Sequence, residues 1–70
     1  MGAGEDRDRV AALFALMTGK LEDAAALAFQ GQDRSLLAVD AVALAEGIHG
    51  VSTELTILAD AAAALARRAA

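Results

Sequence analysis

The fold is decided by residues 36–69, which read LLAVDAVALAEGIHGVSTELTILADAAAALARRA. Counting by sevens from Leu37 gives one apolar row, and a second row starting at Ala41 alternates with it at spacings of four and three. The first row is Leu37, Leu44, Val51, Leu58 and Leu65, and the second is Ala41, Ile48, Leu55, Ala62 and Ala69. Because neither row holds a charge, this pattern predicts one side of an α-helix that is buried against another helix.

The N-terminal half carries a stripe with the same alternation. It consists of Val10, Phe14, Met17, Leu21, Ala24 and Ala28, and Leu13 and Leu27 widen it on one flank. Ala, Leu, Met and Glu dominate this segment and are strong helix formers. Acidic residues at 5, 6 and 8 suit a helix start. We therefore expect a helix over about residues 6–30, with residues 1–4 as a frayed end.

Residues 30–33, Gln-Gly-Gln-Asp, predict a turn. Gly31 can adopt the left-handed conformation that ends a helix, and the side chain of Asp33 can cap the next one. A connection of about three residues forces the two helices to be antiparallel. The second helix is then expected over about residues 34–69, and it forms a helical hairpin with the first.

Two interpretations are open for residues 47–52. Gly47 followed by Ile48 fits a helix end and Ser52 fits a new helix start, which would give three helices. Leu44, Ile48, Val51 and Leu55 nevertheless keep one helical phase across this segment, which favours a continuous helix. A continuous helix would be about 50 Å long against about 38 Å for the first, so residues 60–70 would overhang.

A chain of 70 residues forms one domain, 1–70, whose own core is marginal. It has no Cys for disulfides, and 57% of its residues are hydrophobic, so oligomerisation is the remaining way to gain stability. We predict that two hairpins dimerise into a four-helix bundle; a monomeric three-helix bundle is the alternative. The predicted core is Val10, Phe14, Met17, Leu21, Leu37, Leu44, Ile48, Val51, Leu55, Leu58 and Leu65. The predicted interface is Leu36, Val39, Val42, Gly47, Gly50 and Ile57.

Charge and hydropathy exclude several classes of partner. The net charge is −4, and a cluster of cations and stacking aromatic residues is lacking, which argues against nucleic-acid binding. The longest uncharged stretch, residues 10–19, is shorter than a membrane span. No secretory signal pattern is present, so we expect a cytoplasmic protein. A thin, Ala-filled bundle is not expected to hold a small-molecule ligand.

Glu46 and His49 are the candidate metal ligands. A Glu-x-x-His spacing puts both side chains on one face of a helix, as in ferritin-like bundles, where Glu22 or Asp23 would add a carboxylate. Both residues, however, fall on the side opposite the Leu37–Leu65 row, together with Thr53 and other polar residues. We therefore predict a surface pair, with no metal and no cofactor, and keep the metal-binding hairpin as an alternative function.

His49 is also a candidate phosphoacceptor, because it is the only His of the chain. Residues 49–55, His-Gly-Val-Ser-Thr-Glu-Leu, resemble the segment that exposes a single His on histidine phosphotransfer and histidine-kinase dimerisation bundles. The Lys or Asn that often follows the His in those families is missing here. The resemblance implies a second alternative, a phosphotransfer-type bundle.

Other catalytic chemistry lacks the necessary groups, since Ser35 and Ser52 have only His49 as a base and no orienting third group. The sequence therefore predicts a non-enzymatic interaction or oligomerisation module, such as a small adaptor, regulator or assembly subunit. Its predicted partner is a second copy of the chain or a helix of another protein.

Overall fold

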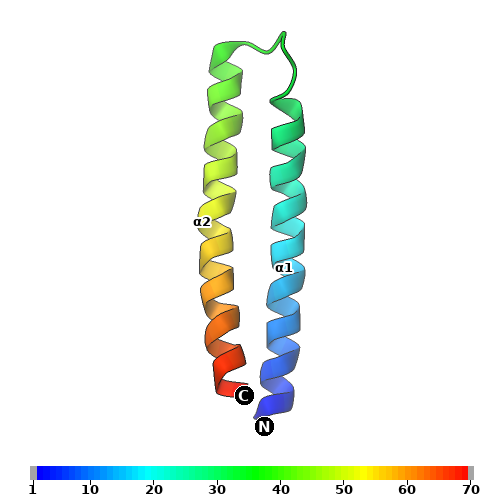
Figure 1. Cartoon of the computed structure of the whole chain (residues 1–70), viewed down its shortest axis with the longest axis vertical. Helices are drawn as coiled ribbons and strands as arrows, with labels where there is room; N and C mark the ends of the chain where they lie inside the picture. The colour runs from blue at the N-terminus through cyan, green and yellow to red at the C-terminus, as the bar shows by residue number, and fades with distance from the viewer. Residues whose placement is uncertain (1, 70) are drawn as a thin grey trace.

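The computed structural model describes residues 2–69, which form two antiparallel α-helices joined by a loop (Figure 1). Helix α1 spans Ala3–Gln30 and helix α2 spans Ala38–Ala69. The hairpin measures 54 × 14 × 13 Å, as expected for two long helices side by side with no further layer over the described residues. The prediction of an all-α antiparallel hairpin is confirmed.

Helix α2 is continuous through Gly47 and Gly50. The continuous-helix interpretation is therefore confirmed, and the break at 47–52 that would give three helices is wrong. Gly47 lies in the contact between the helices, where a Cβ would lie 3.2 Å from Cδ1 of Leu27 on α1. A side chain at this position would therefore require Leu27 to shift by a few tenths of an ångström.

Helix α1 begins earlier than predicted. Ala3 and Gly4 are helical, and the N–H of Asp6 donates to the carbonyl of Gly2 at 3.0 Å. The prediction of a frayed end is wrong for these residues; Met1 lies outside the described residues. The first turn is held because Asp6 is bound to Arg68 near the end of α2.

The loop is longer than predicted, from Gly31 to Leu37. Gly31 has right-handed dihedral angles, φ −68° and ψ −12°, and its N–H donates to the carbonyl of Leu27, so the left-handed prediction is wrong. Asp33 does not cap α2: its Oδ1 accepts bonds from the N–H and the hydroxyl of Ser35, at 2.9 and 2.7 Å. This local turn holds residues 33–36 out of the helix, and the carbonyl of Leu37 accepts the first bonds of α2.

A single register relates the two helices. Asp6 binds Arg68, Lys20 binds Glu54, and Leu27 approaches Gly47. These contacts are 14 and then 7 residues apart on both helices, as expected for a heptad repeat packed antiparallel. Because α1 starts early and α2 starts late, the first turn of α1 lies beside the last turns of α2 (Figure 1), so the predicted overhang of residues 60–70 is wrong for the described residues.

The contact between the helices is only partly buried. Its half-buried members on α1 are Val10, Leu13, Met17, Lys20, Ala24 and Leu27, and on α2 they are Leu44, Gly47, Ile48, Val51, Leu55, Leu58, Leu65 and Ala69. Ala62, 2% exposed, is the buried hydrophobic residue of the described chain, and within residues 2–69 no large side chain is fully buried. The hairpin is therefore a contact between two surfaces and lacks a closed core.

Three residues that the sequence assigned to the core lie outside this contact. Phe14 is 58% exposed, Leu21 56% and Leu37 66%. On α1 the row that faces α2 is displaced by one residue from the predicted stripe. Leu13 and Lys20 take the places predicted for Phe14 and Leu21, because Asp6, Lys20 and Leu27 face α2. Leu37 belongs to the loop, since α2 begins at Ala38.

Candidate functional site

The two flanks of the helix contact differ in charge. On α2, one flank consists of the residues that directly precede Ile48, Leu55 and Ala62 in the sequence. The other flank consists of the residues that directly follow the row from Leu44 to Leu65, which is counted by sevens. The first flank holds Gly47, Glu54, Ala61 and Arg68, together with Arg9, Leu16 and Asp23 of α1. The second flank holds Ala45, Ser52, Ala59 and Ala66, together with Phe14, Leu21 and Ala28 of α1. We call these the ion-paired side and the uncharged side.

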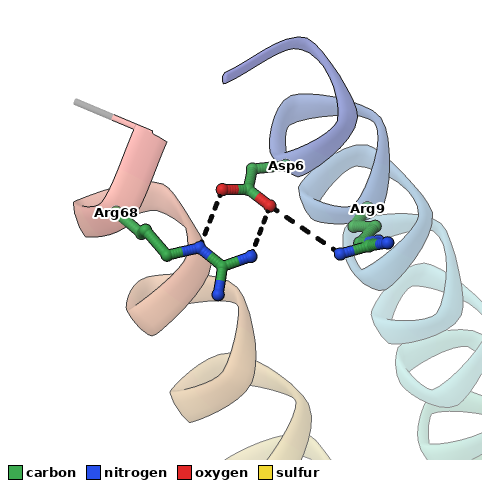
Figure 2. Close-up of polar contacts among 3 residues, drawn as sticks. All are labelled: Asp6, Arg9 and Arg68. Carbon is green, nitrogen blue, oxygen red and sulfur yellow. Dashed lines mark hydrogen bonds and ion pairs between the residues drawn. The ribbon is translucent and has the colours of Figure 1, made fainter. Parts of the chain in front are cut away.

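At the open end of the hairpin, Asp6 and Arg68 form a two-pronged ion pair (Figure 2). Arg68 donates from Nε to Oδ2 at 2.9 Å and from Nη2 to Oδ1 at 2.7 Å. Arg9 lies on the other side of the carboxylate, with Nη1 3.9 Å from Oδ1. Asp6 is only 5% exposed. The pair joins the first turn of α1 to the last turns of α2.

The ion pair changes the titration of Asp6. The hydrogen bonds from Arg68 lower the pKa of Asp6 below its ordinary value of 3.8; burial opposes this shift, and the positive charges of Arg68 and Arg9 add to it. The same carboxylate raises the pKa of Arg68. Asp6 is therefore held as an anion, and its charge contributes to the docking of the two helix ends.

A second ion pair lies in the middle of the ion-paired side. The ammonium group of Lys20 binds Oε2 of Glu54, and this contact raises the pKa of Lys20. Leu16, Ile57 and Leu58 surround the pair and form an open, shallow depression. Because the charged groups are partly exposed, this depression is a solvated surface with an apolar rim.

The uncharged side carries no Asp, Glu, Lys or Arg between residues 10 and 66. Its next row outward is also free of these residues and consists of Ala11, Thr18, Ala25, Val42, His49, Thr56 and Ala63. All these residues are exposed in the single hairpin. Phe14 and Leu21 are its largest side chains and lie next to small residues of α2. Between residues 10 and 66 this side is therefore a long surface without a carboxylate, ammonium or guanidinium group.

The candidate metal ligands do not form a cluster. Glu46 and His49 are exposed, and no group of three His, Cys, Asp or Glu side chains that could hold a metal ion occurs within residues 2–69. The carbonyl of His49 accepts a bond from Thr53 Oγ1 at 3.2 Å, as in an ordinary exposed helix turn.

The predicted interface residues are spread over several sides of the hairpin. Val39, Val42 and Ile57 are exposed by more than half, and Gly50 is exposed. Gly47 instead lies in the contact between the two helices of one chain, and Leu36 is half-buried in the loop. These six residues therefore do not make one continuous surface.

Sequence reasoning missed the two ion pairs between the helices. Asp6 and Arg68 are 62 residues apart, and Lys20 lies between the apolar Leu13 and Leu27 in its row. The signal that could have found them is the matching 14-residue spacing of opposite charges on both helices, Asp6 with Lys20 and Glu54 with Arg68, but this spacing has meaning only once the register is known. The same register moves Phe14 and Leu21 from the hairpin contact onto the uncharged side.

Together, the fold and its surfaces define a two-helix antiparallel hairpin with one ion-paired and one uncharged side. Comparison of the chain with protein-family models, curated proteins and solved structures gave no match. Neither α1 nor α2 has an apolar stretch long enough to cross a membrane.

Proposed function

We propose that this chain is a non-enzymatic interaction module, a helical hairpin that dimerises into a four-helix bundle and serves as a small adaptor, regulator or assembly subunit. The observation that supports this most strongly is the absence of a closed core in the described residues. Eight large hydrophobic side chains of residues 2–69 are more than half exposed, and none is fully buried. A second pair of helices would supply the missing half of the core.

The surface area supports the same proposal. The chain exposes 5079 Å², whereas a compact monomer of this mass is expected to expose about 4,100 Å². The excess of about 1,000 Å² per chain is close to the roughly 800 Å² that each partner buries in a specific interface. Dimerisation would thus bring the exposed area to that of an ordinary small protein.

The surface is better suited to packing than to chemistry. The exposed side chains of the uncharged side are mainly Ala with Phe14 and Leu21, and small helix faces let a second helix come close. The ionisable groups with shifted pKa values, Asp6, Lys20, Asp33 and Arg68, each have a partner that explains the shift structurally. This favours an interaction role over catalysis.

Measurement of molar mass by light scattering over a concentration series tests the proposal. We expect twice the mass of one chain at micromolar concentration, and a thermal midpoint that rises with concentration because folding and association are coupled. A compact, helical species with the mass of one chain up to millimolar concentration would contradict the proposal.

A further inference from the structure

We infer that the second copy of the chain packs against the uncharged side, with Phe14 and Leu21 at the centre of the interface. The inference rests on the dimerisation proposed above and adds the face, the partner and the arrangement of the helices. It differs from the interface predicted from sequence, which included Ile57 on the ion-paired side.

The free-energy cost of removing water differs between the two sides. Burying the ion-paired side would remove water from Lys20 and Glu54, whose side chains are 37% and 50% exposed, and from Arg68 and Arg9. The attraction within an ion pair often fails to offset that loss of hydration. The uncharged side has no Asp, Glu, Lys or Arg between residues 10 and 66, so a second copy can cover it without burying a carboxylate, ammonium or guanidinium group.

Two hydroxyl groups in the row next to the uncharged side already have partners. Thr18 Oγ1 donates to the carbonyl of Phe14, and Thr56 Oγ1 donates to the carbonyl of Ser52, both at 3.0 Å. Burial of these two Thr side chains therefore leaves no unsatisfied donor.

The shape of the uncharged side matches a second copy of itself. Its large residues, Phe14 and Leu21, lie on α1, whereas the adjoining residues of α2 are small. A twofold axis parallel to the helices would place α1 of one copy against α2 of the other at the same level. The register then sets Phe14 beside Ala59 of the second copy and Leu21 beside Ser52. Every neighbouring pair of helices in this bundle is antiparallel.

Substitution of two leucines with equal exposure tests which side forms the dimer interface. Leu16 and Leu21 lie on the same helix and are both 56% exposed, but they lie on opposite sides. We expect Leu21→Glu to raise the dissociation constant of the dimer by at least about 100-fold, because two carboxylates per dimer would be buried. Leu16→Glu should change it by less than about threefold, since exposed substitutions have small effects. Sedimentation equilibrium measures both; equal effects, or a larger effect of Leu16→Glu, would overturn the inference.

A second measurement does not depend on the stability of a disrupted variant. The chain has no Cys, so Ala59→Cys and Ala61→Cys each introduce a single thiol, on the uncharged and the ion-paired side. We expect alkylation of Ala59→Cys to slow at least about tenfold as the protein associates, while Ala61→Cys keeps its rate because its side stays solvated.

The outcomes separate the two proposals. Protection of Ala61→Cys instead of Ala59→Cys, in a dimeric protein, would contradict the uncharged side as the interface and leave the proposed function standing. A monomeric wild-type protein would contradict both. Association only with a different protein, with Ala59→Cys protected in that complex, would contradict the second copy as the partner.

Discussion

The ion-paired side and the uncharged side lie along the same two helices, but they make different contacts. On the ion-paired side, Asp6–Arg68 and Lys20–Glu54 connect α1 to α2 within one chain. On the uncharged side, Phe14 and Leu21 contribute little to the hairpin because they are more than half exposed. The comparison indicates that one side sets the register of the hairpin and the other is available for association.

The largest expected effect comes from Phe14, compared with Phe29. Both are exposed in the single hairpin, Phe14 by 58% and Phe29 by 74%, but only Phe14 lies on the uncharged side. We expect Phe14→Ala to lower the free energy of unfolding by about 3 kcal/mol per chain, since a second copy buries this ring. Phe29→Ala should change it by less than about 0.5 kcal/mol. Urea denaturation of both variants at one concentration measures the difference, and equal values would remove the distinction between the sides.

A smaller effect is expected at the open end of the ion-paired side. Arg68→Ala removes both hydrogen bonds to Asp6 and leaves a carboxylate that is only 5% exposed without its main partner. Arg67→Ala removes an equal charge at the adjacent, exposed position. We expect the denaturation midpoint to fall more for Arg68→Ala than for Arg67→Ala. If the two variants behaved alike, the ion pair would have no part in holding the helix ends together.

The pH dependence of stability should report the same contact. Because Arg68 lowers the pKa of Asp6 in the folded state, the unfolded state binds a proton more readily. The contribution of Asp6 is therefore complete above about pH 4 to 5 and is lost as the pH falls through its ordinary value of 3.8 toward the folded pKa. We expect Asp6→Asn to flatten this part of the profile of unfolding free energy against pH. An unchanged acid limb in Asp6→Asn would show that other carboxyl groups cause it.

The smallest expected effect distinguishes two glycines within α2. A Cβ at Gly50 meets nothing within 4 Å, so Gly50→Ala should stabilise the protein by about 0.5–1 kcal/mol through helix propensity. A Cβ at Gly47 would lie 3.2 Å from Leu27 Cδ1, so Gly47→Ala should gain about 0.5 kcal/mol less, because Leu27 must shift. Thermal unfolding measures both. A larger gain for Gly47→Ala would show that the helices do not approach closely there.

Much of the hairpin was predictable because its signals are local. The apolar rows of α2 keep their phase through Gly47 and Gly50, and the structure confirms one helix there. The start of α2 was harder to predict, because Asp33 can either cap a helix or form a local turn. Its bonds from the N–H and the hydroxyl of Ser35 form the turn. The early start of α1 depends on Arg68, which is remote in sequence. Interactions between distant residues decide such ends, and no local pattern encodes them.

The candidate surface was less predictable for the same reason. Counting by sevens put Phe14 and Leu21 in the hairpin contact, but a rotation of one residue along α1 fits the sequence nearly as well, through Leu13 and Leu27. The pairing of Lys20 with Glu54 selects the rotated arrangement. A small change in the rotation of a helix therefore converts two core residues into a surface.

The sequence by itself determined two helices, their antiparallel order and the continuity of the second, because backbone propensity and apolar spacing act within a few residues. Only the tertiary structure decided the register, the ends of the helices and which flank remains free of charge. These depend on how side chains from opposite ends of the chain meet, and that meeting is set by packing and ion pairing across the two helices.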